Sequence, residues 1–237
     1  MSLAMWQWAT QREKLASLRE RLSDPLLSAL TIILLLLLFV VAPLQVAGVI
    51  TGHATGFAFD AMLVVAAFMV SGSRVAFGAI LLAAFLVIAA VALHPPPIVE
   101  IYLDTLAWLI AGVTLSVVVA RTVYAPGKVT LHRIVGAVFL YLNVGLIFVA
   151  LFGFVALVVP DSFNGLGPIE GNLIIAGKLV YFSFVTLTTT GYGDITPLHP
   201  YARSLVNLEA IFGQLYPATL LARLVTLQLE ERHSSRG

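Results

Sequence analysis

The residues best suited to chemistry form one short run, Thr188-Thr189-Thr190-Gly191-Tyr192-Gly193-Asp194, which we call the glycine loop. Two glycines flank its tyrosine, and glycine adopts backbone angles that residues with a Cβ adopt poorly. The segment before it, Asn172–Thr188, is moderately apolar and has the length of a helix that crosses about half a membrane. Non-helical backbone at membrane depth is tolerated only where it is buried in protein or lines a water-filled cavity. The pattern therefore predicts a re-entrant loop whose backbone faces water or ions.

The composition indicates that this loop belongs to an integral membrane protein. Of the 237 residues, 60% are hydrophobic and 11% are charged, whereas soluble domains carry roughly 25% charged residues. The net charge of +1 and the lack of a basic block give no basis for binding nucleic acid. Without any Cys, the chain has no disulfides, thiol catalysis or thiolate metal sites. Its five His residues show no metal-ligand spacing, so we expect no cofactor.

Six apolar stretches are candidates for membrane-spanning helices. They are Leu26–Ile50, His53–Ser73, Val75–Leu93, Ile98–Ala120, Ile134–Val159 and Ala202–Leu229. Lys and Arg beside such spans concentrate on the cytoplasmic side. If the N-terminus is inside, 11 of the 13 Lys and Arg residues lie on that side, and Lys178 and Arg203 lie outside. We therefore expect both termini to be cytoplasmic and the glycine loop to enter the membrane from the outside.

The residues around the glycine loop resemble the pore helix and selectivity filter of tetrameric potassium channels. The matching run is Tyr181-Phe182-Ser183-Phe184-Val185-Thr186-Leu187 followed by the glycine loop. The usual filter of the family reads Thr-Val-Gly-Tyr-Gly, so Thr190 stands where Val is commonest. The resemblance covers roughly residues 130–229. It implies an all-α protein of the cell membrane that conducts K⁺ passively, and a homotetramer, because one filter per chain requires four chains to close a ring.

The resemblance also implies roles for individual residues. Rings of carbonyl oxygens replace the hydration shell of K⁺ in such filters. The residues whose carbonyls are expected to bind K⁺ are Thr189, Thr190, Gly191 and Tyr192, with Gly193 completing the filter. The Thr189 hydroxyl is expected to add a ligand, and the Tyr192 ring to point away from the ions. The residues expected to support the filter and its outer mouth are Asp194, Tyr181 and Thr188.

The expected organisation has four parts. They are a cytoplasmic amphipathic segment at 1–24, a four-helix membrane domain at 25–125 in the place of a voltage sensor, a pore domain at 130–229 and a short cytoplasmic tail at 230–237. Within the pore domain we expect an outer helix at 134–159, a pore helix at 172–188, the filter at 189–194 and an inner helix at 202–229.

The mode of opening is predicted from the fourth and sixth spans. Ile98–Ala120 contains no Lys or Arg, whereas voltage sensing needs about 3–4 gating charges per subunit. We therefore expect no steep voltage dependence, and a channel that is open constitutively or gated at the filter, by lipid or by a separate regulatory subunit. In the last span, Gly213 and Pro217 are candidates for a gating hinge or a static bend. Glu209 is ionisable within the membrane, which indicates function; we favour a hydrogen bond to the pore helix or the filter's rear wall over ion contact.

Alternative functions use the same residues. Gly191-Tyr192-Gly193-Asp194 also matches the Gly-x-Gly-Asp pattern of intramembrane aspartyl proteases, but that chemistry needs two carboxylates that share a proton. No Tyr-Asp dipeptide occurs in the chain, and Ile134–Val159 has no acidic residue. A potassium transporter subunit resembles a channel with four pore loops in one chain, and this chain has one. A weakly selective cation channel usually lacks the filter tyrosine, which is present here as Tyr192. The expected partners are therefore K⁺, membrane lipid and further copies of the chain.

Overall fold

The computed structural model describes residues 27–47, 49, 73–93, 96–124, 131–167 and 172–234, nearly all of them helical. The α-helices are α4 (Arg74–Leu93), α5 (Pro97–Val123), α6 (Leu131–Val158), α7 (Asn172–Leu187) and α8 (Pro200–Ser234). An earlier helix covers residues 27–46 and ends as the π-helical turn η1 (Leu37–Val41) and α2 (Ala42–Val46). Two short strands, β1 (Phe163–Asn164) and β2 (Thr196–Pro197), pair antiparallel. The amphipathic segment expected at 1–24 and residues 53–72 of the expected second span lie outside the described residues.

Four of the described helices are long and apolar enough to cross a membrane. They are Leu27–Leu44, Arg74–Leu93, Tyr102–Arg121 and Arg133–Val158, and they correspond to the first, third, fourth and fifth expected spans. A helix satisfies its own backbone hydrogen bonds, which lipid cannot do. The apolar helix Ile175–Leu187 within α7 is too short to cross, as expected of a half-crossing helix. The described part of the chain is therefore an all-α membrane protein.

The helix of the sixth expected span is longer than the sequence predicts. We expect it at 202–229, whereas α8 is one helix over Pro200–Ser234. Pro200 is its first residue, where the fixed φ of proline suits a helix and its missing N–H costs nothing. At the other end, Glu and Arg are good helix formers, and no glycine or proline interrupts the helix between Pro217 and its end. Most of the tail expected at 230–237 is therefore a continuation of α8.

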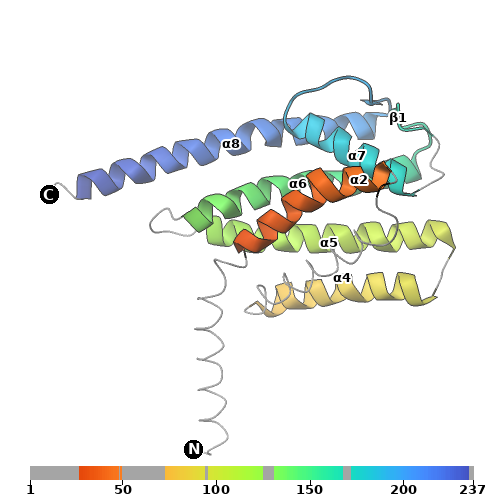
Figure 1. Ribbon diagram of the computed structural model, residues 1–237, viewed down its shortest axis with the longest axis horizontal. Coiled ribbons are helices and arrows are strands. Elements are labelled where there is room, and N and C mark those ends of the chain that lie inside the picture. Colours follow the sequence, from red (N-terminus) through yellow and green to blue (C-terminus); the bar gives the residue numbers. More distant parts are fainter. Residues whose placement is uncertain are drawn as a thin grey trace, which may run out of the picture.

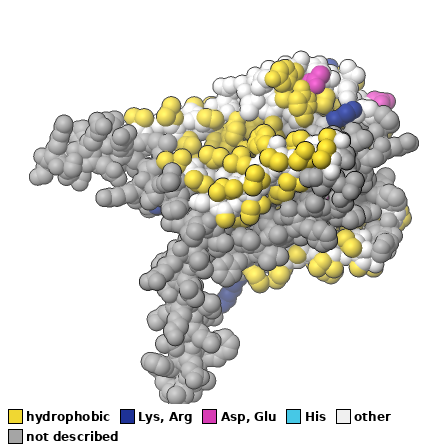
Figure 2. Space-filling model, viewed as in Figure 1, with side chains coloured by type: hydrophobic (Ala, Val, Ile, Leu, Met, Phe, Trp, Pro, Cys, Tyr) yellow, Lys and Arg dark blue, Asp and Glu magenta, His cyan; other side chains and the backbone are white. Residues whose placement is uncertain are grey.

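The helices lie side by side, with the strands at one end of the bundle (Figure 1). α4 packs on α5, α5 packs on α6, and α6 contacts both α7 and α8. α7 also packs on α8 and on α2. In Figure 1, α2 lies at the end of the bundle where β1 is found, whereas α4 begins at the opposite end. On the face drawn in Figure 2, hydrophobic side chains run along the helices, and the visible acidic side chains lie near the β1 end.

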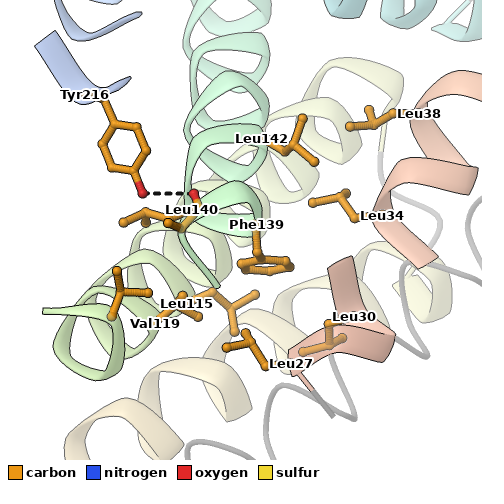
Figure 3. Close-up of a cluster of buried hydrophobic side chains, with 12 residues drawn as sticks. Leu27, Leu30, Leu34, Leu38, Leu115, Val119, Phe139, Leu140, Leu142 and Tyr216 are labelled. Carbon is orange, nitrogen blue, oxygen red and sulfur yellow. Dashed lines mark hydrogen bonds between the residues drawn. The ribbon is translucent and has the colours of Figure 1, made fainter. Parts of the chain in front are cut away.

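The first described helix packs against the later part of its own chain (Figure 3). Leu27, Leu30, Leu34 and Leu38 recur at the spacing of one helix face, and all four are buried. Phe139 of α6 is fully buried among them. The other buried residues of this cluster are Leu115, Val119, Val123, Ala137, Leu140, Leu142 and Tyr216. The first membrane helix therefore packs on α5 and α6 of the same chain.

A polar contact joins α5 to α6 inside this apolar bundle. The Asn143 side-chain amide donates to the Gly112 carbonyl at 2.8 Å and to Ser116 Oγ at 2.9 Å. Asn143 is buried, and a buried amide is costly unless it is hydrogen-bonded. A Cβ on Gly112 would lie 2.9 Å from a side-chain carbon of Ile147, so α5 and α6 approach closely here. The bond therefore fixes how α5 is rotated against α6.

Three phenylalanine rings join α7 to α6 and to strand β1. Phe152 of α6, Phe163 of β1 and Phe182 of α7 contact one another, with ring centroids 5.2, 5.6 and 5.8 Å apart. Such ring pairs contribute about 0.5–1.5 kcal/mol each beyond the burial of their area. Because the rings come from three separate segments, they fix α7 against α6 and against the segment that carries β1.

Candidate functional site

The glycine loop turns back along the end of α7. Backbone amides at its start donate to α7 carbonyls: Thr189 N to Thr186 O at 2.9 Å, and Thr190 N and Gly191 N to Val185 O at 2.9 and 3.3 Å. The last carbonyls of a helix have no partner within the helix, so the loop satisfies two of them. In a trans peptide the N–H and C=O bonds point in opposite directions. The carbonyls of Thr189 and Thr190 therefore point away from α7.

Every second residue of the loop has a positive φ. The values are +57° at Thr189, +59° at Gly191 and +80° at Gly193. Two of these residues are glycines, which adopt such angles at no steric cost. When residues of left-handed and right-handed backbone conformation alternate, successive N–H groups point to one side of the backbone. The carbonyl groups then point to the other side. For Thr189 a positive φ is strained, since its side chain is β-branched.

The threonine side chains at the start of the loop bond within the protein. Thr188 Oγ1 donates to Phe184 O at 2.7 Å, and the hydroxyls of Thr188 and Thr190 lie 2.9 Å apart. The hydroxyl of Thr190 therefore has a partner that a valine at this position would lack. Both side chains are held beside α7.

Two tyrosines stack beside the outer half of the loop. The rings of Tyr181 and Tyr192 are parallel within 1°, with centroids 6.3 Å apart. The Tyr181 hydroxyl also interacts electrostatically with the Asp194 carboxylate. Tyr192 is nevertheless 71% exposed in the single chain. Tyr181 thus lies beside both Tyr192 and Asp194, and much of the Tyr192 ring is left uncovered.

The outer end of the loop is attached to the segment before α7. Strands β1 and β2 pair with Phe163 opposite Pro197, directly after the loop. Gly165 has a φ of +88°, and a Cβ there would lie 3.2 Å from the Asp194 carbonyl carbon. Only glycine allows this approach without strain. Lys178 of α7 donates to Leu166 O at 2.7 Å, which ties the same segment to α7.

The inner end of α7 lies directly on α8. A Cβ on Gly213 would lie 2.8 Å from the carbonyl carbon of Leu187 and closer still to its oxygen. The same oxygen accepts a hydrogen bond from the Tyr141 hydroxyl at 3.1 Å. Because the neighbour is backbone, it cannot rotate away from a larger side chain. Gly213 is therefore required for a close approach of two helices, a role that the hinge hypothesis does not include.

Gly213 and Pro217 belong to one turn of α8. Proline has no N–H, so the Gly213 carbonyl four residues earlier lacks its usual helical donor. The helix is continuous through this turn. The two residues proposed as a hinge thus act on the same backbone group, and whether the turn moves stays a prediction.

Glu209 is fully buried between α8 and α7. Its Oε1 lies 2.5 Å from Ser183 Oγ, and that hydroxyl also lies 2.8 Å from the Gly145 carbonyl of α6. One hydroxyl hydrogen serves only one of these acceptors, so a carboxyl that carries its own proton satisfies both contacts. Its Oε2 is buried without a hydrogen-bond partner, and an ionised carboxylate is costly in such a place. The geometry agrees with the expected hydrogen bond to the pore helix.

Three contributors to the site are not singled out by the sequence analysis. They are Tyr141, Ser183 and Gln214. The side-chain Nε2 of Gln214 donates to Thr189 Oγ1 at 2.9 Å. The signal that selects Glu209, a polar residue in an apolar helix, applies to Gln214 as well. Among the described residues, no group of three or more His, Cys, Asp or Glu side chains is placed to hold a metal ion, so ligands for a cation here would be backbone and hydroxyl oxygens.

Comparison with known proteins agrees with this geometry. A family model described as "Ion channel" matches residues 144–229, from the middle of α6 through α7 and the glycine loop into α8. No curated protein and no solved structure matches the chain. The match supports an ion channel and points to a non-enzymatic function. With the four apolar helices, it supports a membrane protein.

Proposed function

We propose that this protein is a potassium-selective channel that conducts K⁺ passively across the cell membrane. The observation that carries the proposal is the backbone of the glycine loop. Its first amides bond back to α7, and every second residue has a positive φ, so its carbonyls gather on the side away from the protein. Carbonyls of this kind replace the hydration shell of K⁺. The proposed ligands are the carbonyls of Thr189, Thr190, Gly191 and Tyr192 and the Thr189 hydroxyl.

The channel is proposed to be a homotetramer around this loop. All seven residues of the glycine loop are exposed in the single chain, although exposed non-helical backbone is not tolerated in lipid. On α8, Leu208, Ile211 and Leu215 lie at the spacing of one helix face, and each is more than half exposed. Four copies around a common axis enclose the loops in a ring and cover these faces.

The proposed topology has six spans with both termini in the cytoplasm. The arrangement of α2 and α4 supports it, because the chain leaves the bundle at the β1 end and returns at the opposite end (Figure 1). We also propose that the channel is not steeply voltage-gated, since the span Ile98–Ala120 carries no Lys or Arg.

The proposal is tested by flux through the purified full chain in liposomes, with K⁺ and Na⁺ gradients compared and barium added as a filter blocker. We expect K⁺ flux far above Na⁺ flux and block by barium. Equal Na⁺ and K⁺ flux would support a weakly selective cation channel instead.

A variant pair tests the loop itself. Gly191→Ala places a side chain in open space but at a φ of +59°, so we expect loss of selective flux through backbone strain rather than through a clash. Gly78→Ala, also in open space but within α4, is the matched control and should conduct normally. Selective flux retained in folded Gly191→Ala would refute the filter assignment.

A further inference from the structure

Gln214 of α8 makes a direct contact with the glycine loop. Its side-chain Nε2 donates to Thr189 Oγ1 at 2.9 Å, across 25 residues of sequence. Both residues are exposed to solvent in the single chain. Nothing in the resemblance or in the matched family assigns a role to this glutamine.

The contact acts on the residue of the loop that most needs support. Thr189 has a φ of +57°, which is strained for a β-branched residue. Its hydroxyl has one hydrogen and two lone pairs. When Gln214 donates to one lone pair, the second lone pair and the hydrogen take up fixed directions. Gln214 therefore determines where the Thr189 oxygen presents its free lone pair.

The backbone around Gln214 is also fixed. The preceding residue, Gly213, lies against the Leu187 carbonyl at the end of α7, so α8 cannot slide along α7 without opening that contact. The amide is thus held at the inner end of the loop, and its second N–H and its carbonyl stay exposed.

We propose that Gln214 is a positioning residue for the innermost K⁺ site, and that four Gln214 amides form a polar ring directly inside the filter. The ring orients the four Thr189 hydroxyls toward a dehydrated cation, and its remaining amide groups face the hydrated cation about to enter. This inference rests on the proposed function and adds a determinant of ion selectivity that lies outside the filter sequence.

The test measures barium block and the K⁺ to Na⁺ flux ratio of the full chain in liposomes. Barium is a divalent cation close in size to K⁺, so it reports on the innermost ligands. For Gln214→Leu and Gln214→Met, which remove the amide but keep similar bulk, we expect the half-blocking barium concentration to rise about 2- to 10-fold, the factor that corresponds to one hydrogen bond. Gln214→Glu adds negative charge to the ring, so we expect the concentration to fall.

A double-mutant cycle separates this role from a general effect on folding. In a Thr189→Ala background, Gln214→Leu should have little further effect on barium block, because the contact is already gone. Thr226→Val is the matched control: it removes a hydroxyl of α8 that bonds only within the helix, to Ala222 O at 3.0 Å, and should leave block unchanged.

The outcomes distinguish two failures. Unchanged barium block and selectivity in both Gln214→Leu and Gln214→Met, or an undiminished effect of Gln214→Leu in the Thr189→Ala background, would overturn the role of Gln214 and leave the channel intact. Absence of selective K⁺ flux in the unsubstituted protein would overturn the proposed function and this inference together.

Discussion

Replacing Gly213 by alanine distinguishes a close-contact glycine from a flexible hinge. The new Cβ would lie 2.8 Å from the Leu187 carbonyl carbon, whereas carbon atoms are most stable about 3.5–4.0 Å apart. The Leu187 oxygen would lie closer still, so relief requires α8 and the end of α7 to separate by more than about 1 Å. That movement stretches the bond from Tyr141 to Leu187 O, now 3.1 Å, and the bond from Gln214 to Thr189, now 2.9 Å.

Gly213→Ala changes the free energy of unfolding through terms of opposite sign. Alanine favours the helix over glycine by about 1 kcal/mol. Overpacking costs about 1–3 kcal/mol, and a weakened hydrogen bond costs about 1 kcal/mol more. We therefore expect Gly213→Ala to lower stability by about 1–3 kcal/mol. Gly78→Ala, which has nothing within 4 Å of the new Cβ in α4, should instead gain about 0.5–1 kcal/mol.

The assay is the thermal unfolding midpoint of each purified variant in the same detergent, followed by K⁺ flux in liposomes. The expected order of midpoints is Gly78→Ala, then the unsubstituted protein, then Gly213→Ala. A Gly213→Ala midpoint equal to or above that of the unsubstituted protein would refute the close-contact argument. If such a variant also showed altered opening, the hinge interpretation would be supported instead.

Substitutions at three further residues test contacts between the helices and beside the loop. Glu209→Gln keeps a partner for Ser183 and should unfold near the normal midpoint, whereas Glu209→Leu should lose about 1–3 kcal/mol; a loss in Glu209→Gln as large as in Glu209→Leu would show that an ionised carboxylate is needed. Asn143→Leu removes both donors that join α6 to α5 and should lower the midpoint by an amount equivalent to about 1–2 kcal/mol, a result contradicted by an unchanged unfolding curve. Tyr181→Phe keeps the ring stack but removes the hydroxyl that interacts with Asp194, so the K⁺ to Na⁺ flux ratio should fall by up to about 10-fold; a ratio equal to that of the unsubstituted protein would show that this interaction does not support the loop.

The sequence predicts α7 and the glycine loop closely because both are bounded by strong local signals. A Gly- and Asn-rich segment precedes α7, and two glycines follow it; the expected helix at 172–188 agrees with Asn172–Leu187 to within one residue. The end of α8 is less predictable, since the change from apolar to charged residues marks the edge of the membrane and not the end of the helix.

The sequence predicts the pore helix as a partner of Glu209, but the individual residues that contact Glu209, Gly213 and Gln214 could not be predicted, for a different reason. Periodicity identifies a buried face when a helix is apolar on one side only. α6 is apolar almost all round, so its sequence carries little information about how it is rotated against α7 and α8. The contact between Ser183 and the Gly145 carbonyl depends on that rotation, which is set by packing between whole helices. The π-helical turn η1, which places Phe39 against Phe184 at 5.9 Å, is likewise invisible to a regular helical pattern.

The attachment of the glycine loop at both ends has a consequence for how the channel assembles. The first residues of the loop are held by hydrogen bonds with their own subunit, to Val185 and Phe184 of α7 and from Gln214 of α8. Ordering a residue costs about 1–2 kcal/mol of backbone entropy, and for these residues that cost is met when the subunit folds. Subunits that meet in the membrane therefore bring loops whose first residues, Thr188–Gly191, are already ordered. In the proposed tetramer, assembly is the docking of preformed surfaces, and its rate should depend on subunit concentration and not on a slow ordering of the ion pathway.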